Sequence, residues 1–278
     1  MNQGGNSVLI IGKPGTSKTT FLAQLYGKLV TTPGRLKLRQ APQDLLAIDE
    51  ARRRLAEGQP TESTPAEQNK VLRLSLLLDD EPLEVEFPDY GGEQVKAIIR
   101  DRQLGLQWAE MCRNSNTWLI FIRLHDHVEP HDVLTKSYTE VAPASTEVTS
   151  DTHVEPVHTN EAVELVELLQ MLLATRSIGT QVPITQPRLK LVLTLWDELQ
   201  TDDLPEAVLA HRYPLLLQYA RSNWHPAALQ VWGLSAQGFR LDTEENQDKY
   251  LDYTPAEHAY VILPSGGEPV HDLSLLFE

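Results

Sequence analysis

The sequence is poor in cysteine and has no long apolar run. Cys112 is the only cysteine among 278 residues, so no disulfide can form within the chain, as is typical of a reducing compartment. No run approaches the roughly 18 consecutive apolar residues that a membrane-spanning helix needs. The first residues also lack the basic segment followed by an apolar one that marks a secretory signal peptide. We therefore expect a cytoplasmic protein with no membrane partner.

Basic residues are also scarce. There are 24 lysines and arginines against 39 aspartates and glutamates, which gives a formal net charge of −15. Nucleic acids and anionic membrane surfaces attract clusters of positive charge, so this balance argues against both as general partners. Hydrophobic residues make up 41% of the chain, which is enough for a substantial core. An anionic ligand would therefore need positive charge concentrated at one place.

Short apolar runs alternate with segments of helical periodicity, which predicts an α/β fold. We expect a doubly wound, mostly parallel sheet with helices on both faces and one antiparallel hairpin at its edge, turning at 79–82. Strands are predicted at 7–11, 71–78, 83–87, 117–124, 188–194 and 229–234, with a further edge strand at 260–263. Helices are predicted at 19–30, 43–56, 93–113, 161–176 and 203–222.

We expect a single domain over residues 1–278. The segment at about 125–160 is rich in Thr, Ser, Glu, Pro and His and has no apolar period, which predicts a flexible insertion. The chain ends in the apolar segment 272–278, which is compatible with a longer polypeptide.

The most informative motif is Gly12-Lys-Pro-Gly-Thr-Ser-Lys-Thr19, which follows an apolar strand and opens a helix. That context is the one a phosphate-binding loop (Walker A) needs, because its backbone amides and the helix N-terminus attract anions. Lys18 would neutralise β- and γ-phosphate oxygens, and the Thr19 hydroxyl would bind Mg²⁺. The residues predicted to cradle a nucleoside triphosphate are Gly12, Lys13, Pro14, Gly15, Thr16, Ser17, Lys18, Thr19 and Thr20.

A second motif, Asp89-Tyr-Gly-Gly92-Glu93, follows the second strand of the predicted hairpin. An aspartate at the end of a strand beside the phosphate loop can hold Mg²⁺ through a water molecule. Gly92, three residues on, lets a backbone amide approach the γ-phosphate because it has no Cβ. Glu93 could orient or deprotonate the attacking water, or it could cap the helix that follows.

Two further motifs follow later strands. Thr194-Leu-Trp-Asp197 ends the strand at 188–194, and the Asp197 carboxylate could accept two hydrogen bonds from guanine that adenine cannot offer. At about 1.5–3 kcal/mol each, two such bonds would favour GTP over ATP by roughly 10²–10⁴. Ser235-Ala236 ends the strand at 229–234, where a backbone amide could bind guanine O6.

With these four motifs in order, the chain resembles the TRAFAC-type P-loop GTPases, whose domain is a Ras-like P-loop NTPase fold. More narrowly, it resembles the bacterial double-GTPase families of anti-phage and other conflict systems. This resemblance implies binding of GTP and GDP with Mg²⁺, hydrolysis of GTP, and a nucleotide-controlled switch. It also implies a protein partner, which could be a second GTPase or an effector, in bacterial defence.

Three positions depart from that class. Ser17 replaces the second glycine of the loop and would fit if the backbone there is near-helical. Thr194 and Leu195 replace the usual Asn-Lys of N-K-x-D, which puts guanine selectivity in question. Glu93 stands where Ras-like proteins have a water-orienting glutamine.

Some roles stay open at this stage. Thr64, with Thr61 as the alternate, is the candidate for the switch threonine that contacts Mg²⁺ and the γ-phosphate. One of Arg52–Arg54, Arg100, Arg102 or Arg123 could act as an arginine finger in cis, but nothing in the sequence chooses among them. Because none is evident, we expect slow hydrolysis without a partner. One alternative is a P-loop ATPase that uses Asp79–Glu81. The other is a non-hydrolysing, nucleotide-bound interaction module that docks through 125–160.

Overall fold

A computed structural model describes residues 6–31, 34–42, 45–62, 71–88, 92–124, 160–177 and 181–278. One eight-stranded sheet runs through the molecule in the order β2-β3-β4-β1-β5-β6-β7-β8. The strands are β1 (Asn6–Gly12), β2 (Leu36–Leu38), β3 (Leu72–Leu78), β4 (Glu81–Phe87), β5 (Thr117–Arg123), β6 (Arg188–Thr194), β7 (Leu229–Ser235) and β8 (Tyr260–Ile262). This is the α/β P-loop NTPase architecture that the sequence predicts.

The five central strands, from β4 to β7, are mutually parallel. Four of them, β1, β5, β6 and β7, are buried on both faces over most of their length, as in β5, where only Arg123 is not fully buried. In β4 buried and partly exposed residues alternate. Antiparallel strands lie on both sides of this core: β2 and β3 beside β4, and β8 beside β7. The predicted hairpin and the late edge strand are therefore confirmed, and β2 extends the sheet beyond the hairpin.

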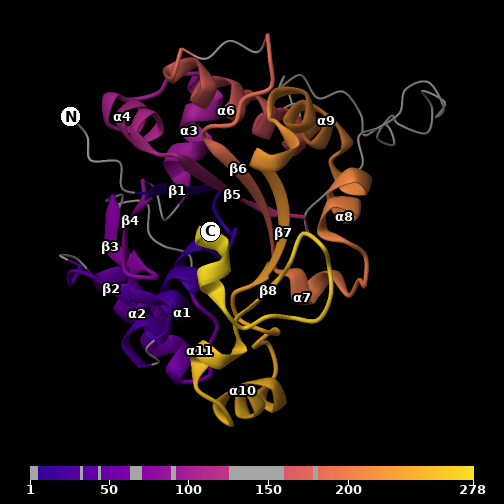
Figure 1. Ribbon diagram of the computed structural model, residues 1–278. Coiled ribbons are helices and arrows are strands. Elements are labelled where there is room, and N and C mark those ends of the chain that lie inside the picture. The colour runs from indigo at the N-terminus through magenta and orange to yellow at the C-terminus, as the bar shows by residue number, and fades with distance from the viewer. Residues whose placement is uncertain are drawn as a thin grey trace, which may run out of the picture.

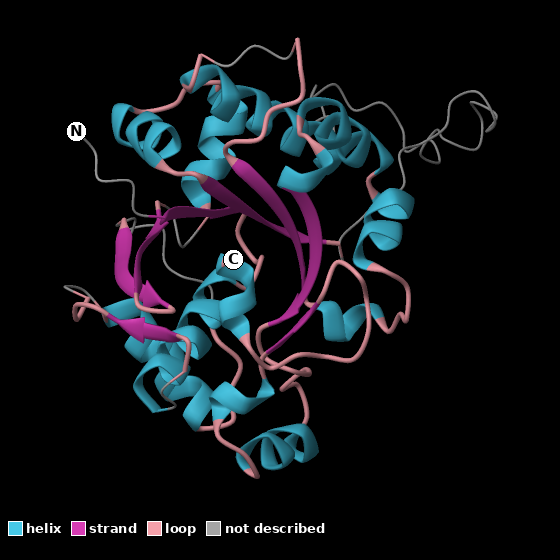
Figure 2. Ribbon diagram, viewed as in Figure 1, coloured by secondary structure: helices cyan, strands magenta, loops and turns pink. Residues whose placement is uncertain are grey.

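Helices cover both faces of the sheet (Figures 1 and 2). On one face α3, α4, α6 and α9 pack over a core that includes Trp118, Leu168 and Leu191. On the other face α1, α2 and the C-terminal turn pack over a core that includes Phe21, Phe121 and Phe277. The main helices are α1 (Lys18–Thr31), α2 (Leu46–Ala56), α3 (Glu93–Asp101), α4 (Leu106–Asn114), α6 (Glu161–Thr175), α8 (Pro205–Arg212), α9 (Pro214–Asn223) and α10 (Glu244–Leu251).

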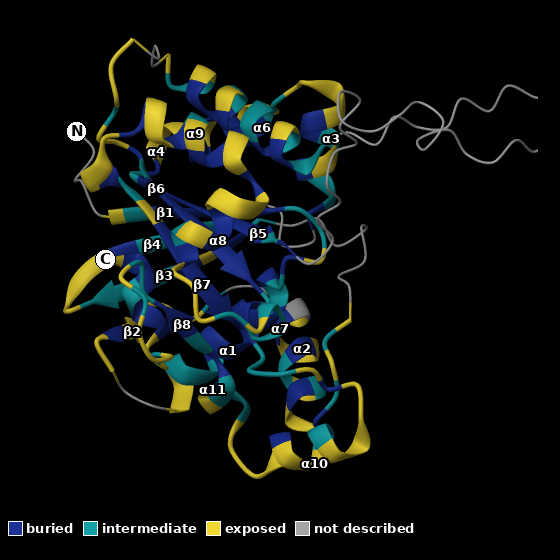
Figure 3. Ribbon diagram, turned by 90° about the vertical axis from the view of Figure 1, so that its right-hand side faces the viewer, coloured by how far each residue is buried: buried dark blue, intermediate teal, exposed yellow. Residues whose placement is uncertain are grey.

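Short helical segments complete the fold: α7 (Trp196–Leu199), α11 (Pro255–His258), η2 (Pro226–Ala228) and η3 (Leu273–Phe277). The strands form the buried centre, and the outer surfaces of the helices carry the exposed residues (Figure 3). In the part of the chain that the structure describes, no helix is both long and apolar enough to cross a bilayer.

Two predicted helices are each divided. The helix expected at 93–113 ends at Arg102, which takes a left-handed conformation with φ +49°, and α4 begins only after Gly105. The helix expected at 203–222 breaks at Tyr213-Pro214, because a proline removes an amide donor and restricts the residue before it. Both divisions leave the apolar faces directed at the same core.

The ATPase alternative based on Asp79–Glu81 is wrong. Asp79 and Asp80 form the tight turn between β3 and β4, with φ +50° and +66°, and they pair with Arg35 and Lys37. Glu81 is the first residue of β4, whose Leu83 pairs with Asn6 at the start of β1. These acids therefore lie at the opposite end of β1 from Gly12 and the phosphate loop.

Candidate functional site

The predicted phosphate loop connects β1 to α1 at the carboxyl end of the parallel strands, which is where sheets of this kind bind ligands. Gly15 has φ +75° and Ser17 has φ +56°. A right-handed, near-helical backbone was the condition under which serine would fit here, and it is not met. Ser17 instead takes a left-handed backbone that glycine adopts without penalty. Directly after it, the Phe21 amide donates to the Ser17 carbonyl and starts α1.

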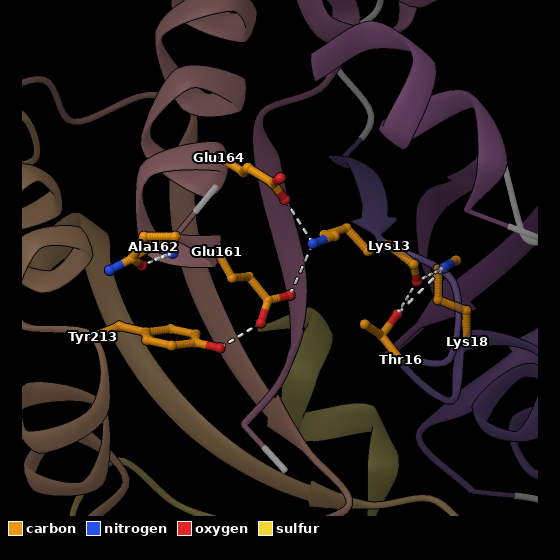
Figure 4. Close-up of polar contacts among 8 residues, drawn as sticks. Lys13, Thr16, Lys18, Glu161, Ala162, Glu164 and Tyr213 are labelled. Atoms are coloured by element: carbon orange, nitrogen blue, oxygen red, sulfur yellow. Dashed lines mark hydrogen bonds and ion pairs between the residues drawn. The ribbon is translucent and has the colours of Figure 1, made fainter. Parts of the chain in front are cut away.

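Lys18 is held inside the loop rather than on the surface. Only 3% of the residue is exposed. Its Nζ donates to the carbonyl oxygens of Gly12 at 2.6 Å and Lys13 at 2.7 Å, and it lies 3.3 Å from the Thr16 hydroxyl (Figure 4). Two loop carbonyls therefore hold the buried ammonium of Lys18 beside the loop, where its full positive charge can attract a phosphate anion.

Gly92 lies against the phosphate loop. A Cβ built on it would lie 2.4 Å from the Pro14 nitrogen and 2.5 Å from the Lys13 carbonyl carbon, and its φ is +85°. Glycine is required here on both grounds. The D-x-x-G motif therefore reaches the loop through its glycine, while Asp89 lies outside the described residues.

A cavity of about 540 Å³ opens beside the loop and collects residues from several strand ends. Glu93, the first residue of α3, lines it. The wall consists of Pro14–Thr20, Pro60–Glu62, Glu93, Arg123, Leu195, Glu198, Gln237 and Arg240–Asp242. Arg123, Glu198 and Arg240 belong to no motif in the sequence, and only their positions beside strand ends could have indicated them.

Two of the threonines proposed to contact Mg²⁺ lie at the cavity. Thr19 lines the cavity, and so does Thr61, whose hydroxyl is 2.6 Å from that of Thr20. Thr64 lies outside the described residues, as does most of the predicted insertion at 125–160. Of the two switch candidates, the structure thus describes only Thr61, and it lies at the cavity.

The two base-reading motifs are brought together. The Ser235 hydroxyl donates to Asp197 at 2.6 Å and accepts a bond from the Gly238 amide. Burial raises the pKa of Asp197, and the hydrogen bond from Ser235 opposes that rise. Asp197 does not line the 540 Å³ cavity; it lines a neighbouring hollow with Tyr260, while Leu195 and Glu198 face the cavity itself.

Thr194 and Ala236 are buried beneath this motif pair. The Thr194 hydroxyl donates to the Ile122 carbonyl at 3.2 Å, which links the ends of β5 and β6. Thr194 therefore supports the loop that carries Leu195 and Asp197. Leu195 itself has φ +55°. On the far side of the cavity, Glu198 accepts a bond from Arg240 at 2.7 Å.

Lys13 points away from the cavity toward α6 (Figure 4). Its Nζ lies 2.7 Å from Glu164 and 3.3 Å from Glu161, and Glu161 also accepts a bond from the Tyr213 hydroxyl. Burial lowers the pKa of Lys13, but the hydrogen bonds and charges of Glu164 and Glu161 outweigh it, and the net pKa is raised. The loop is thereby fastened to the start of α6.

A second, larger cavity of about 950 Å³ lies beside the C-terminal half of α1. Its lining is mostly apolar, and it contains none of the predicted site residues. Size alone does not decide between the two cavities. The 540 Å³ cavity is lined by the buried Lys18, by the loop with its left-handed residues, and by acidic and basic side chains that could bind or hydrolyse a nucleotide.

The family described as Double-GTPase 1 matches residues 9–278 of this chain. No curated protein matches this chain. Among solved structures, the chain is similar to one described as Methanosarcina barkeri Roco2 RocCORdC bound to GDP, with 13% sequence identity and a TM-score of 0.33. The match covers 92% of this chain and 52% of the other, so this chain spans about half the length of that protein.

Proposed function

This chain belongs to the Double-GTPase 1 family, and we propose that it is a Mg²⁺-dependent GTPase that works as a nucleotide-controlled switch. The observation that supports this most is the convergence at one cavity. A buried loop lysine, Glu93 and Leu195 come from three different strand ends and line the same 540 Å³ space. Of these, Lys18 has the chemistry for phosphate, Glu93 for water and Leu195 for a flat base.

Phosphate binding would rest on the loop and Lys18. The amides of residues 13–18 and the N-terminus of α1 attract anions, and the buried ammonium of Lys18 adds a full charge. The chain's net charge of −15 makes this local positive charge necessary. Charge-assisted bonds contribute about 1.5–3 kcal/mol each, so Lys18 would supply much of the affinity.

The described residues fit Mg²⁺, a hard cation that prefers oxygen ligands and retains water. The hydroxyls of Thr19 and Thr61 line the cavity beside the loop, and Thr19 would hold the metal. Asp89 and Thr64 remain the other proposed ligands. Bound there, Mg²⁺ would neutralise charge on the phosphates.

Glu93 is the proposed catalytic acid–base group. Its side chain is 42% exposed and its nearest cation, Lys96, is 3.9 Å away, so the carboxylate remains accessible to water. It would orient the water that attacks the γ-phosphorus or accept its proton, while Lys18 neutralises charge on the oxygens. Such proton transfer typically contributes 10²–10⁴ in rate.

Base recognition would depend on Asp197, with the Ser235–Ala236 backbone beside it. The Ser235 bond fixes the orientation of the carboxylate, which would accept hydrogen bonds from guanine. The switch would involve Gly92, whose backbone touches Lys13 and Pro14 and would respond to loss of the γ-phosphate. We further propose that the switch regulates a protein partner, a second GTPase or an effector, in a bacterial conflict system, and that it acts in the cytoplasm.

Competition binding tests the nucleotide. We expect GTP to bind more tightly than ATP by about 10²–10⁴, and Lys18→Ala to weaken GTP binding by about 100-fold or more. Lys28→Ala, on the same helix but bonded to the His271 carbonyl outside this cavity, is the matched control and should bind GTP normally. Equal affinity for ATP, or unchanged GTP affinity in Lys18→Ala, would overturn the proposal.

Phosphate release tests hydrolysis separately from binding. Glu93→Gln preserves the shape of the side chain but removes its charge, so GTP binding should persist while the rate falls by about 10²–10⁴. If wild-type protein binds GTP and releases no phosphate, the chain is a nucleotide-bound interaction module. If Glu93→Gln hydrolyses GTP normally, Glu93 only begins α3.

A further inference from the structure

Arg123 places a cation on the side of the phosphate loop that faces the base motifs. It is the last residue of β5 and lines the same cavity as Lys18 and Thr19. A Cβ built on Gly15 would lie 3.3 Å from its Nη1, so the guanidinium lies against Gly15 in the loop.

None of the other arginines that the sequence offers for phosphate contact is among the residues that line the cavity, although Arg54 contacts two that are, Pro60 and Glu62. Each pairs with an acidic residue. These pairs are Arg52 with Asp49, Arg53 with Glu50, Arg54 with Glu62, Arg100 with Asp101, and Arg102 with Glu167. Arg240 does line the cavity, but on the far wall, bonded to Glu198.

The order of the strands tells which part of a nucleotide Arg123 would meet. At the carboxyl edge, the sheet runs β4-β1-β5-β6-β7. Gly92 and Glu93 follow β4, the loop follows β1, and Leu195 follows β6. A GTP molecule with its γ-phosphate toward Glu93 and its base toward Asp197 must cross β5 with the atoms between them. Those atoms are the α- and β-phosphates and the ribose.

We propose that Arg123 binds the α,β-diphosphate of guanine nucleotides and is not an arginine finger for the γ-phosphate. This inference rests on the proposed GTP-binding function. A guanidinium is always charged and offers five donors in a planar fork, which suits two phosphate oxygens at once. GDP and GTP share the α,β-diphosphate, so Arg123 contributes equally to both complexes. Such uniform binding changes affinity and leaves the chemical step untouched.

The test compares two affinities with one rate. Kd values for GDP and GTP are measured by titration, and phosphate release is measured at saturating GTP. Arg123→Ala should raise both Kd values by the same factor, about 10- to 100-fold, while kcat stays within about threefold. Arg123→Lys, which keeps the charge but loses the fork, should fall between Ala and wild type. Arg100→Ala, at the end of α3, is the arginine control and should match wild type.

Each other outcome has a definite meaning. Loss of kcat with unchanged GDP affinity would overturn the proposal and make Arg123 an arginine finger. Unchanged affinity and rate in Arg123→Ala would overturn it as well. If Arg123→Ala does not fold, the Lys variant decides, because an affinity equal to that of wild type would again contradict a forked contact. Failure of the wild-type protein to bind GDP or GTP would instead refute the function itself.

Discussion

Replacing Gly92 by alanine should distort the phosphate loop, although Gly92 is not part of that loop. The new Cβ would lie 2.4 Å from the Pro14 nitrogen and 2.5 Å from the Lys13 carbonyl carbon, whereas ordinary contacts begin near 3.4 Å. Both neighbours are backbone atoms, so no side chain can rotate away. Either the loop or the start of α3 must move by about 1 Å.

The magnitude has three parts. A left-handed conformation costs alanine about 1–2 kcal/mol, and Gly92 has φ +85°. Forcing an extra methyl group into packed structure costs about 1–3 kcal/mol more. Alanine also lowers the conformational entropy of the unfolded chain, which stabilises the folded state by about 0.4–1 kcal/mol. We therefore expect Gly92→Ala to lower the free energy of unfolding by about 1–5 kcal/mol.

Gly105→Ala is the matched control for this substitution. Gly105 also precedes a helix, but its φ is −65° and a Cβ there would meet nothing within 4 Å. Urea unfolding should place this control within about 0.5 kcal/mol of wild type. Phosphate release should fall by about 10²-fold in Gly92→Ala, because a shift of 1 Å in positioning groups has that effect. If both variants unfold and hydrolyse GTP alike, the contact between Gly92 and the loop does not matter.

Two further predictions concern charge and backbone. Burial and the nearby charge of Arg188 lower the pKa of Lys190 from 10.5 to about 8, so its charged form destabilises the folded state below pH 8. Urea unfolding of Lys190→Met should show a gain of up to ~3 kcal/mol at pH 7 that disappears as the pH rises toward 10.5; an equal gain at both pH values would contradict this. Ser17→Gly should raise the free energy of unfolding by about 0.5 kcal/mol, because relief at φ +56° exceeds the added chain entropy. A loss of stability would show that the left-handed assignment is wrong.

The parallel strands were predictable because they are short, continuous apolar runs with clear borders in the sequence. Runs such as Leu119–Ile122 and Leu189–Leu193 are buried on both faces, and a glycine, a proline or a polar loop borders each. The order of the motifs then predicts their meeting at one edge, since parallel strands end on the same side. The contact between Ser235 and Asp197 follows from that rule.

Other features depend on tertiary contacts that the pattern does not contain. β2 has only three residues, and its single buried side chain, Leu36, carries no period. The apolar residues of α3 and α4 keep the same helical periodicity across the break, so the sequence pattern alone predicts one continuous helix. Ser17 takes a positive φ although nothing about serine indicates it, since the loop closure sets that angle. Arg123 and Glu198 belong to no motif, and only their places at strand ends bring them to the cavity.

The basic side chains around the phosphate loop, Lys13, Lys18 and Arg123, make different contacts. Lys13 is engaged by Glu161 and Glu164, so its charge positions α6 and is largely neutralised before it can reach a phosphate. Lys18, Arg123 and Arg240 are the basic residues that line the cavity, and of these Lys18 and Arg123 contact the loop itself. Because Gly92 and α6 both fix the loop from outside, binding in the loop and the positions of these elements must influence each other reciprocally. A partner that holds α3 or α6 in a different place would thus change nucleotide affinity without touching the nucleotide.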